Sequence, residues 1–235
     1  MKKKYFCILF LVLLFLARIL TTEQSVKVMK HIFNRNSKPE AEAVTIVIDP
    51  GHGGRDPGKV GVNDALEKDI NLKISLKLKS LLEEKDIKVI MTREEDVGLY
   101  SEGDSNRKRA DLNNRINTIN GSGALFAISI HQNSFTEEYV KGAQVFYHAQ
   151  SAVGRELAEL LQETIKNSLK DGNHRKAKSN ESYFMLKKTN CPLVIVECGY
   201  LSNQGEAALL VTEEYQNKMA EAICTGIQEY LKKER

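Results

Sequence analysis

From residue 44 onward, short apolar runs alternate with longer amphipathic segments. The short runs are rich in Val, Ile and Phe, which is typical of strands buried on both faces. They predict strands at residues 44–48, 87–91, 124–130, 143–147 and 193–197, with a weaker candidate at 183–186. The longer segments predict helices at residues 66–85, 106–120, 152–169 and 213–232. Apolar residues recur at helical spacing in the third helix, and Gly121 lies where a glycine would end the second.

The segment at residues 66–85 fits two periodicities. Apolar residues alternate with polar ones from Ile70 to Leu78, as in a strand. Leu66, Ile70, Ile74 and Leu78 also recur every four residues, as in a helix. We favour the helix because the segment is about twenty residues long, beyond a typical strand, and is rich in Lys, Leu and Glu.

This alternation predicts a single α/β domain, with a mostly parallel sheet and helices on both faces. The sequence shows no repeat and no second domain after residue 43. In such sheets, binding sites form beyond the carboxyl ends of the strands. The residues that follow the strands are therefore the first candidates for function.

The N-terminus has a different pattern. Lys2, Lys3 and Lys4 precede an unbroken apolar run, and Arg18 follows it. This is the form of a secretory signal, and the run is shorter than the ~20 residues of a membrane-spanning helix. We expect residues 1–20 to direct export, either as a cleaved signal peptide or as an N-terminal anchor, and residues 21–43 to form a linker. The protein would then act outside the cytoplasmic membrane, touching it only through an uncleaved N-terminal segment.

The net charge of +3 comes from this segment, because its four basic residues have no acidic counterpart and the rest of the chain sums to −1. A basic surface for nucleic acid is therefore not expected. Cys191, Cys198 and Cys224 lie beyond the segment, and they lack the C-x-x-C spacing of a zinc cluster. Their odd number also gives no disulfide framework.

Polar residues at the ends of the predicted strands suggest a catalytic site. His52 follows the first strand, His131 follows the third, and Glu197 closes the last. Glu67 lies in the first turn of the helix after the first strand. Two imidazoles, a carboxylate and an open position suit a catalytic zinc ion, which activates water. A second carboxylate could carry the proton from that water to a leaving amine, so the set indicates metal-assisted hydrolysis of an amide.

Each of these residues also has a plainer explanation. His52 could serve only the glycine-rich turn, His131 could be an ordinary polar strand end, and Glu197 could simply meet water. Asp64-Ala65-Leu66-Glu67 has the outline of a capping box, in which Glu67 would serve the start of the helix. The four residues on one predicted rim carry more weight than any one of them.

Two other chemistries fit less well. A phosphate loop would lead directly into a helix, but Arg55-Asp56-Pro57-Gly58 follows the glycines instead. A Cys198–His131 thiol pair is conceivable. Adjacent residues of a regular strand face opposite ways, however, so Glu197 and Cys198 cannot both point into one site while the strand continues.

Five separate stretches of the chain form a specific set. They are IDPGHGGRDPG (48–58), LEKDINL (66–72), MTREED (91–96), SIHQNS (129–134) and LKKTNCPLVIVECGYLSN (186–203). In type and order they resemble the zinc-dependent N-acetylmuramoyl-L-alanine amidases of the amidase-3 family, which cut bacterial peptidoglycan. The resemblance extends over residues 44–232 and implies a six-stranded sheet flanked by helices.

The resemblance also implies roles for the strand-end residues. His52, Glu67 and His131 match the family's zinc ligands, and Glu197 matches its catalytic glutamate. Residues 44–235 would form the zinc amidase catalytic domain. The substrate implied is peptidoglycan, cut at the amide between the lactyl group of N-acetylmuramic acid and L-alanine of the stem peptide.

The sequence departs from the family pattern in two places. Gln132 stands where the family usually has alanine, and residues 62–65 replace a stretch that is often glycine-rich. Both differences could reshape the substrate groove. Asn133, Arg93 and Arg115 are candidate substrate contacts, because arginine suits the carboxylates of a stem peptide. Surface salt bridges would explain both arginines equally well.

The short form, with only an N-terminal export segment, resembles the amidases of spore-forming bacteria that help to make muramic-δ-lactam in the spore cortex. We therefore expect a role in sporulation and germination, in the space between the spore membranes. The rival interpretation is a wall-binding module with the amidase fold, either non-catalytic or dependent on an activating protein partner. The non-catalytic form of that rival predicts no stoichiometric zinc.

Overall fold

The computed structural model describes residues 44–233. The predicted export segment at residues 1–20 and the predicted linker at 21–43 lie outside this range. Within it, no helix is both long and apolar enough to cross a membrane.

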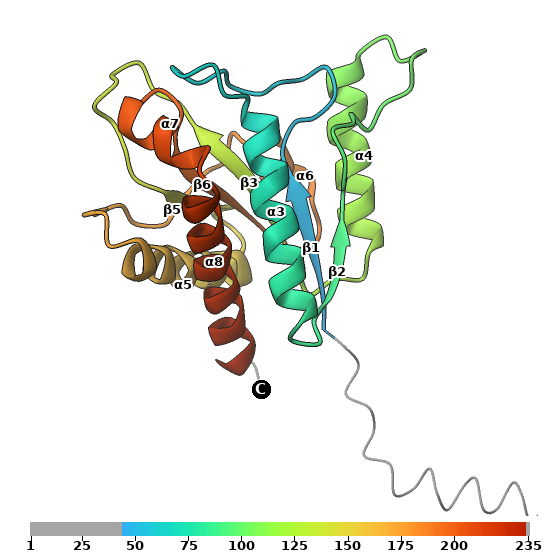
Figure 1. Ribbon diagram of the computed structural model, residues 1–235. Coiled ribbons are helices and arrows are strands. Elements are labelled where there is room, and N and C mark those ends of the chain that lie inside the picture. Colours follow the sequence, from blue (N-terminus) through green and yellow to red (C-terminus); the bar gives the residue numbers. More distant parts are fainter. Residues whose placement is uncertain (1–43, 234–235) are drawn as a thin grey trace, which may run out of the picture. The chain divides into compact units, whose positions relative to one another are not determined.

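One six-stranded sheet forms the centre of the described domain (Figure 1). The order β2-β1-β3-β6-β4-β5 places β1 and β6 on either side of β3. Only β4 runs antiparallel to its neighbour β6, and it is parallel to β5, so the predicted mostly parallel sheet is confirmed. The strands are β1 (Thr45–Pro50), β2 (Lys88–Met91), β3 (Phe126–Asn133), β4 (Gln144–Tyr147), β5 (Lys178–Ser179) and β6 (Leu193–Tyr200).

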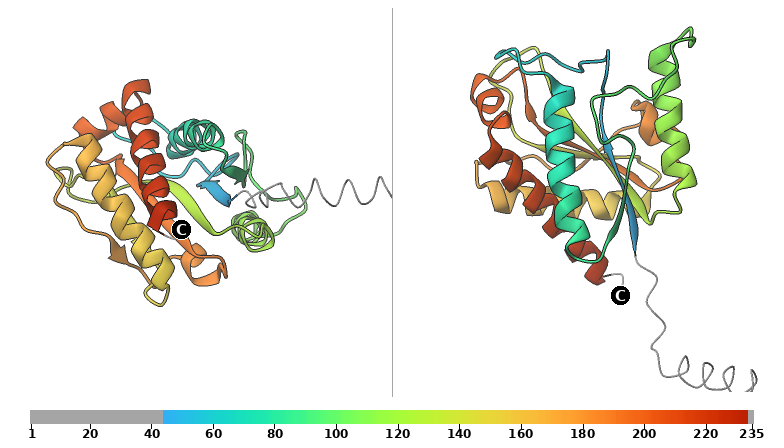
Figure 2. Two further views of the ribbon diagram at one scale, coloured as in Figure 1. Left: turned by 90° about the horizontal axis from the view of Figure 1, so that it is seen from below. Right: turned by 45° about the vertical axis from the view of Figure 1, so that its right-hand side comes forward.

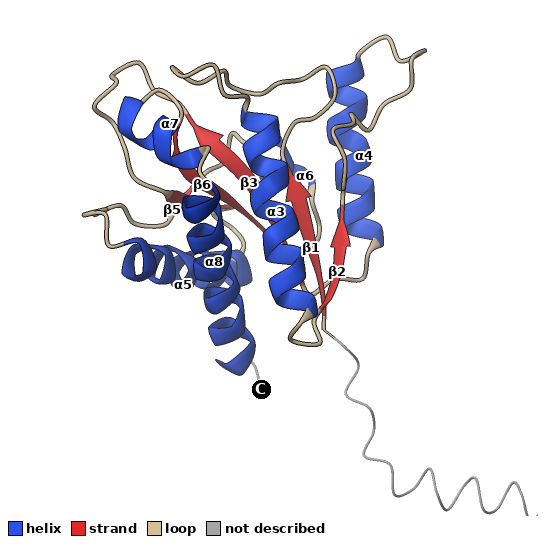
Figure 3. Cartoon of the chain, viewed as in Figure 1, coloured by secondary structure: helices blue, strands red, loops and turns tan. Residues whose placement is uncertain are grey.

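Helices cover both faces of this sheet, as the alternating pattern predicts (Figures 2 and 3). Helices α3, α5 and α8 pack on one face, and α4 and α6 pack on the other. The helices are α3 (Glu67–Glu83), α4 (Arg107–Gly121), α5 (Ala152–Leu169), α6 (Phe184–Lys188), α7 (Gln204–Leu210) and α8 (Glu213–Lys233).

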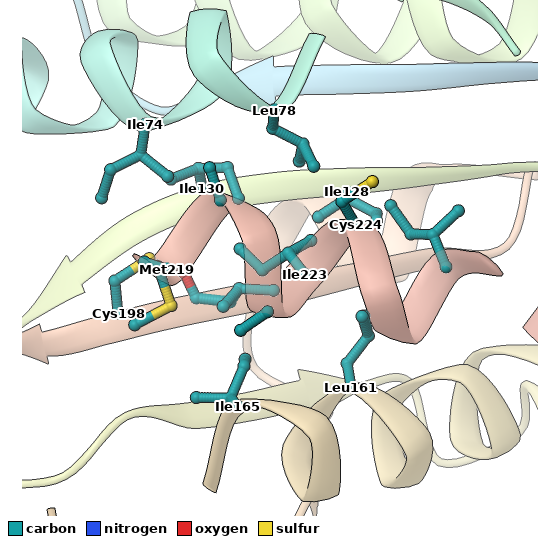
Figure 4. Packing of buried hydrophobic residues seen from close by; sticks show 14 of the residues in the cluster. Ile74, Leu78, Ile128, Ile130, Leu161, Ile165, Cys198, Met219, Ile223 and Cys224 are labelled. Carbon is teal, nitrogen blue, oxygen red and sulfur yellow. Dashed lines mark hydrogen bonds between the residues drawn. The ribbon is translucent and has the colours of Figure 1, made fainter. Parts of the chain in front are cut away.

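Alternation along the strands fills both layers of the core. Ile128 and Ile130 of β3 pack toward α3 and α8, where Met219 and Ile223 meet them (Figure 4). Ala127, between the strand's even-numbered apolar residues, belongs instead to the cluster beneath α4 and α6. Because successive strand residues point to opposite faces, an unbroken apolar run is what a sheet covered on both sides requires.

The weaker strand prediction at residues 183–186 is wrong, because these residues enter α6. The Asn180 side chain accepts the backbone N–H groups of Ser182 and Tyr183, which turns the chain into the helix. The sixth strand is instead β5, two exposed polar residues that carry no hydrophobic signal. The short α7 was not predicted either, although Asn203 caps it by accepting the N–H of Glu206.

The second predicted helix ends close to the predicted place. Gly121 is its last helical residue, Ser122 caps it, and the left-handed backbone falls at Gly123, whose φ is 66°. The glycine signal therefore gave the position of the helix end to within two residues.

The ambiguous segment is a helix, as predicted, and its burial follows the four-residue repeat. Ile70, Ile74, Leu78 and Leu82 are fully or almost fully buried, whereas Leu76 is 38% exposed. Strand periodicity would have placed Leu76 and Leu78 on the same face. The i, i+4 stripe packs α3 against β3 and α8.

This difference gives a paired test of the helix. Leu78→Ala should lower the free energy of unfolding by about 2–5 kcal/mol, because it removes a fully buried side chain and leaves a cavity. Leu76→Ala should change it by less than about 1 kcal/mol, because that side chain is already partly in water. Urea denaturation of both variants measures the two values, and equal losses would contradict the helical packing.

Candidate metal centre

The candidate centre lies at the carboxyl ends of β1, β3 and β6, which are neighbours in the sheet (Figure 1). The register pairs Asp49 with Ser129 across β1 and β3, and His131 with Glu197 across β3 and β6. Paired residues of neighbouring strands face the same side, so His131 and Glu197 are adjacent. Glu67 reaches the same rim from the first position of α3.

His52, Glu67 and His131 form a compact group that could hold a metal ion. One ligand atom from each side chain lies within 4.8 Å of the other two. Glu67 Oε1 is 3.3 Å from His52 Nε2 and 2.9 Å from His131 Nδ1. The two imidazole rings meet edge to face, with centroids 5.0 Å apart. The structure thus brings together the three residues that the sequence singled out as ligands.

The turn after β1 gives His52 its position. His52 has a left-handed backbone with φ 61°, a conformation that non-glycine residues adopt rarely. Its Nδ1 lies 2.9 Å from Asp56 Oδ2, which orients the ring and leaves Nε2 facing Glu67. Sequence reasoning missed Asp56, and its place four residues after a histidine in a glycine-rich turn was the available signal.

Two glycines allow the close approach of the three side chains. A Cβ at Gly51 would collide with the His131 ring. A Cβ at Gly58 would lie 2.6 Å from Glu67 Oε2 and 2.7 Å from His52 Cδ2. The glycines of the IDPGHGGRDPG stretch therefore do more than turn the chain, because Gly51 and Gly58 make room for the imidazoles and the carboxylate.

Arg115 is hydrogen-bonded to the backbone of the turn after β1. Its Nη1 donates to the Pro50 carbonyl at 2.7 Å, and its Nη2 donates to the His52 carbonyl at 2.6 Å. Nη1 also lies 2.8 Å from Asp49 Oδ1 in an ion pair whose two side chains are 2% and 1% exposed. The pair is buried, and it fixes the backbone that carries His52.

Arg93 is hydrogen-bonded to the backbone of the same turn. Its Nε donates to the Pro50 carbonyl and its Nη2 donates to the Gly51 carbonyl, each at 3.0 Å. Three successive carbonyl groups, at residues 50 to 52, therefore face two buried guanidinium groups. The predicted role of Arg93 and Arg115 as substrate contacts stays a prediction, since the bonds in the structure are to the protein itself.

Glu67 is placed by the start of α3 but does not cap it. The helix begins at Glu67 itself, and Leu66 at the N-cap has no side-chain bond, so no capping box forms. Glu67 Oε2 accepts the N–H of Lys59 at 2.8 Å, and Oε1 accepts the N–H of Gln132 at 3.1 Å. These bonds leave the carboxylate between the two histidines.

The electrostatics of the group favour a cation. Burial opposes ionisation of Glu67, but its bonds with His131 and His52 hold its pKa well below the usual range. Burial would also lower the pKa of His52, yet Glu67 and Asp56 raise it to about 9. The same carboxylates of Glu67 and Asp56 would also attract a metal ion, which would bind in place of the imidazole proton.

Glu197 lies beside this group with one oxygen uncommitted. The side chain is 7% exposed, and among residues 44–233 its Oε2 has no hydrogen-bond partner. Burial raises its pKa to about 7, and the nearby Glu67 charge adds to the rise while His131 and His52 oppose it. A buried carboxyl group with a pKa near neutrality can both accept and release a proton at physiological pH.

The remaining strand-end candidates lie outside the group. Cys198 points to the opposite face, where it is fully buried and burial raises the pKa of its thiol. A thiol pair with His131 is thereby excluded. Asn133 ends β3, and its Oδ1 accepts the N–H of Ser134, so its predicted role as a substrate contact stays a prediction.

Fold and site together define an α/β protein with a candidate metal centre at the carboxyl ends of its central strands. The sequence model of the N-acetylmuramoyl-L-alanine amidases (Amidase_3) matches residues 46–229. The chain belongs to this family. Its activity is therefore hydrolysis of the amide between N-acetylmuramic acid and L-alanine in peptidoglycan.

Particular relatives agree with this assignment. The germination-specific N-acetylmuramoyl-L-alanine amidase of Bacillus subtilis is 39% identical over 188 residues, which cover 79% of this chain and 78% of the relative. The CwlD amidase of Clostridioides difficile, solved in complex with the GerS lipoprotein, matches with a TM-score of 0.78 and 42% identity, over 80% of this chain and 98% of that chain. An N-acetylmuramoyl-L-alanine amidase of Clostridium difficile 630 matches with a TM-score of 0.72 and 32% identity, over 81% and 97%.

The space around Gly58 can be tested with a matched glycine. Gly58 and Gly123 have nearly the same positive φ, 67° and 66°, but nothing lies within 4 Å of a Cβ at Gly123. Alanine at either position should cost about 1 kcal/mol of stability from backbone strain. Only Gly58→Ala should also weaken metal binding, because its Cβ displaces Glu67 and His52. Isothermal titration with Zn²⁺ measures this, and equal affinity in both variants would contradict the packing described.

The buried Asp49–Arg115 pair predicts acid sensitivity. Burial alone would raise the pKa of Asp49, but Arg115, Thr92 and Ser129 outweigh burial and lower it. Stability from this carboxylate is therefore complete above its unfolded pKa of about 3.9 and is lost as pH falls through the lower folded value. Asp49→Asn should cost about 1.5–3 kcal/mol at pH 7, because it removes a buried charged hydrogen bond. Arg115 would keep its ion pair with Asp111, whose Oδ2 lies 2.6 Å from the arginine Nε.

Urea denaturation between pH 7 and pH 3 measures this effect. The free energy of unfolding should fall more steeply below pH 4 in the original protein than in Asp49→Asn. Parallel curves would show that Asp49 contributes nothing to the acid response.

Proposed function

We propose that His52, Glu67 and His131 hold a zinc ion and that Glu197 acts as the proton carrier of a peptidoglycan amidase. The observation that carries the proposal is the compact group of three ligand atoms beside a buried glutamate with a free oxygen. Family membership supports hydrolysis of the N-acetylmuramoyl-L-alanine amide as the reaction.

The donor set fits zinc. Two imidazole nitrogens and one carboxylate oxygen are a common protein ligand set of catalytic zinc ions, which keep a further position open. Ligand atoms held about 2 Å from one ion must lie within about 4 Å of one another. The two separations from Glu67, 2.9 and 3.3 Å, meet this, and all three ligand atoms lie within 4.8 Å of one another. The bond between Asp56 and His52 Nδ1 is the orienting contact that metal-binding histidines usually have.

When bound, zinc would supply Lewis-acid polarisation of the lactyl carbonyl and would lower the pKa of water. The chain's own residues supply the proton transfers. Glu197 takes a proton from the attacking water at Oε2 and passes it to the L-alanine nitrogen as the amide bond breaks. Its pKa near 7 suits both steps, because neither protonation state is strongly favoured at neutral pH.

We also propose that the enzyme acts on spore peptidoglycan outside the cytoplasm. The germination-specific relative and the CwlD neighbour support a role in the spore cortex. A part in making muramic-δ-lactam, which the sequence resemblance implies, belongs to the same proposal. Residues 1–20 would direct export, and residues 21–43 would link them to the catalytic domain. The CwlD neighbour was solved with a lipoprotein, which supports a protein partner for this chain as well.

The rival interpretation, a non-catalytic wall-binding module, predicts a degraded site. Here all three proposed ligands and Glu197 are present and adjacent. A partner-dependent enzyme remains compatible with the same geometry. Zinc content and activity, each measured with and without extract from sporulating cells, distinguish the non-catalytic module from the partner-dependent enzyme. The module should stay inactive in both conditions, whereas the partner-dependent enzyme should become active when extract is added.

The proposal is tested with Glu197→Gln. This variant should bind one zinc ion per chain, because Glu197 is not among the ligands. It should release stem peptides from peptidoglycan about 100- to 10,000-fold more slowly than the original protein, because the proton carrier is gone. Mass spectrometry of the released peptides and zinc analysis of the same samples give both readings. Full activity in Glu197→Gln would refute the role of Glu197, and an original protein without zinc would refute the metal site.

A further inference from the structure

We propose that Asn71 and Gln132 form a positioning pair that fixes the three metal-ligand segments relative to one another. This inference rests on the proposed zinc site but goes beyond it, because neither residue is a ligand. Asn71 lies one helical turn after Glu67 in α3, and Gln132 follows His131 in β3. Both side chains are buried, with 0% and 4% exposure.

Asn71 contacts all three ligand segments through one amide group. Its Nδ2 donates to the Gly51 carbonyl at 3.0 Å and to Glu67 Oε1 at 3.4 Å. Its Oδ1 accepts Nε2 of Gln132 at 3.1 Å. Gly51 immediately precedes His52, and Gln132 immediately follows His131, so the side chain links the segments that carry both histidines and the glutamate.

The direction of this chain of bonds is fixed by its ends. The Gly51 carbonyl and the Glu67 carboxylate can only accept, so Asn71 must present its NH₂ group to them. Its oxygen then faces Gln132, which must present its own NH₂ group in turn. A glutamine suits this position because it offers a neutral donor at the end of a long side chain.

Gln132 also carries a cost that argues against a purely stabilising role. Among residues 44–233 its Oε1 is buried and has no hydrogen-bond partner. An unsatisfied buried acceptor costs about 1–3 kcal/mol, which an apolar residue of the same shape would avoid. Mutating residues that hold metal ligands through contacts of this kind typically lowers metal affinity 10- to 100-fold.

The experiment compares two buried glutamines. Gln132→Met keeps the shape of the side chain but removes the donor to Asn71. Gln162→Met is the matched control, since Gln162 is 1% exposed and bonds the backbone of Val145 and Ala143, away from the proposed ligands. Zinc affinity is measured by competition with a chromophoric chelator, and the visible spectrum of the Co²⁺-loaded protein reports the ligand geometry.

We expect Gln132→Met to weaken zinc binding about 10-fold and to shift the cobalt spectrum. Gln162→Met should lower the melting temperature but leave zinc affinity within about twofold and the spectrum unchanged. If Gln132→Met keeps both the affinity and the spectrum of the original protein, the positioning role is overturned. If the original protein binds no zinc, the proposed function fails instead, so the two failures are distinguishable.

A second variant tests Asn71, the residue that contacts all three ligand segments. Asn71→Asp has the same shape but places a carboxylate against Glu67 and the Gly51 carbonyl, so zinc affinity should change more than in Gln132→Met. Ser75→Ala is its control, because Ser75 lies one turn further along α3, is fully buried, and has no partner for its Oγ within residues 44–233. An effect on zinc as large in Ser75→Ala as in Asn71→Asp would overturn the proposal. This pair also decides the matter if Gln132→Met does not fold.

Discussion

The buried ion pair between Asp49 and Arg115 is the interaction on which the candidate centre depends. Neither side chain is more than 2% exposed, so both charges must be paired inside the protein, where Asp111 also pairs with Arg115. The Nη1 and Nη2 groups of Arg115 also donate to backbone carbonyl groups of the turn, and Arg93 donates to two more. With its carbonyl groups held from below, the backbone at His52 can keep a left-handed conformation that would otherwise be unfavourable.

The centre is assembled from segments far apart in the sequence, and the sheet determines where they meet. Because β1, β3 and β6 are parallel neighbours, their carboxyl ends share one rim and place His52, His131 and Glu197 together. Glu67 comes from a helix instead, because it is the first residue of α3. The proposed Asn71–Gln132 pair is hydrogen-bonded to the ligand segments. The centre is therefore held by hydrogen bonds to the turn after β1 and by hydrogen bonds from α3.

Much of this arrangement could be predicted from the sequence, because it depends on strong and local signals. Apolar runs predict five of the strands, and the rule that sites form at strand ends identifies His52, His131 and Glu197 from the sequence alone. The strand β5 and the helix α6 were not predicted. The two-residue strand has no apolar pattern, and the helix depends on a turn made by Asn180.

The supporting residues were harder to predict for a different reason. Asp49, Asn71 and Asp56 act through contacts that only the folded chain creates. Asp56 has one local signal, its place four residues after His52 in a glycine-rich turn, whereas nothing in the local sequence sets Asp49 and Asn71 apart from surface residues. The sequence marks Arg93 and Arg115 as candidate substrate contacts, but their burial next to the turn depends on long-range packing. Only the three-dimensional structure shows that their guanidinium groups face the backbone of residues 50 to 52.

The central claim is that this supported turn presents His52 to a metal ion shared with Glu67 and His131. Anomalous diffraction at the zinc absorption edge, from crystals of the zinc-loaded protein, tests it most directly. The account predicts one strong peak within bonding distance of all three side chains, with the carbonyl groups of residues 50 to 52 still bonded to the two arginines. A peak elsewhere, or a turn released from the arginines while zinc is bound, would contradict it.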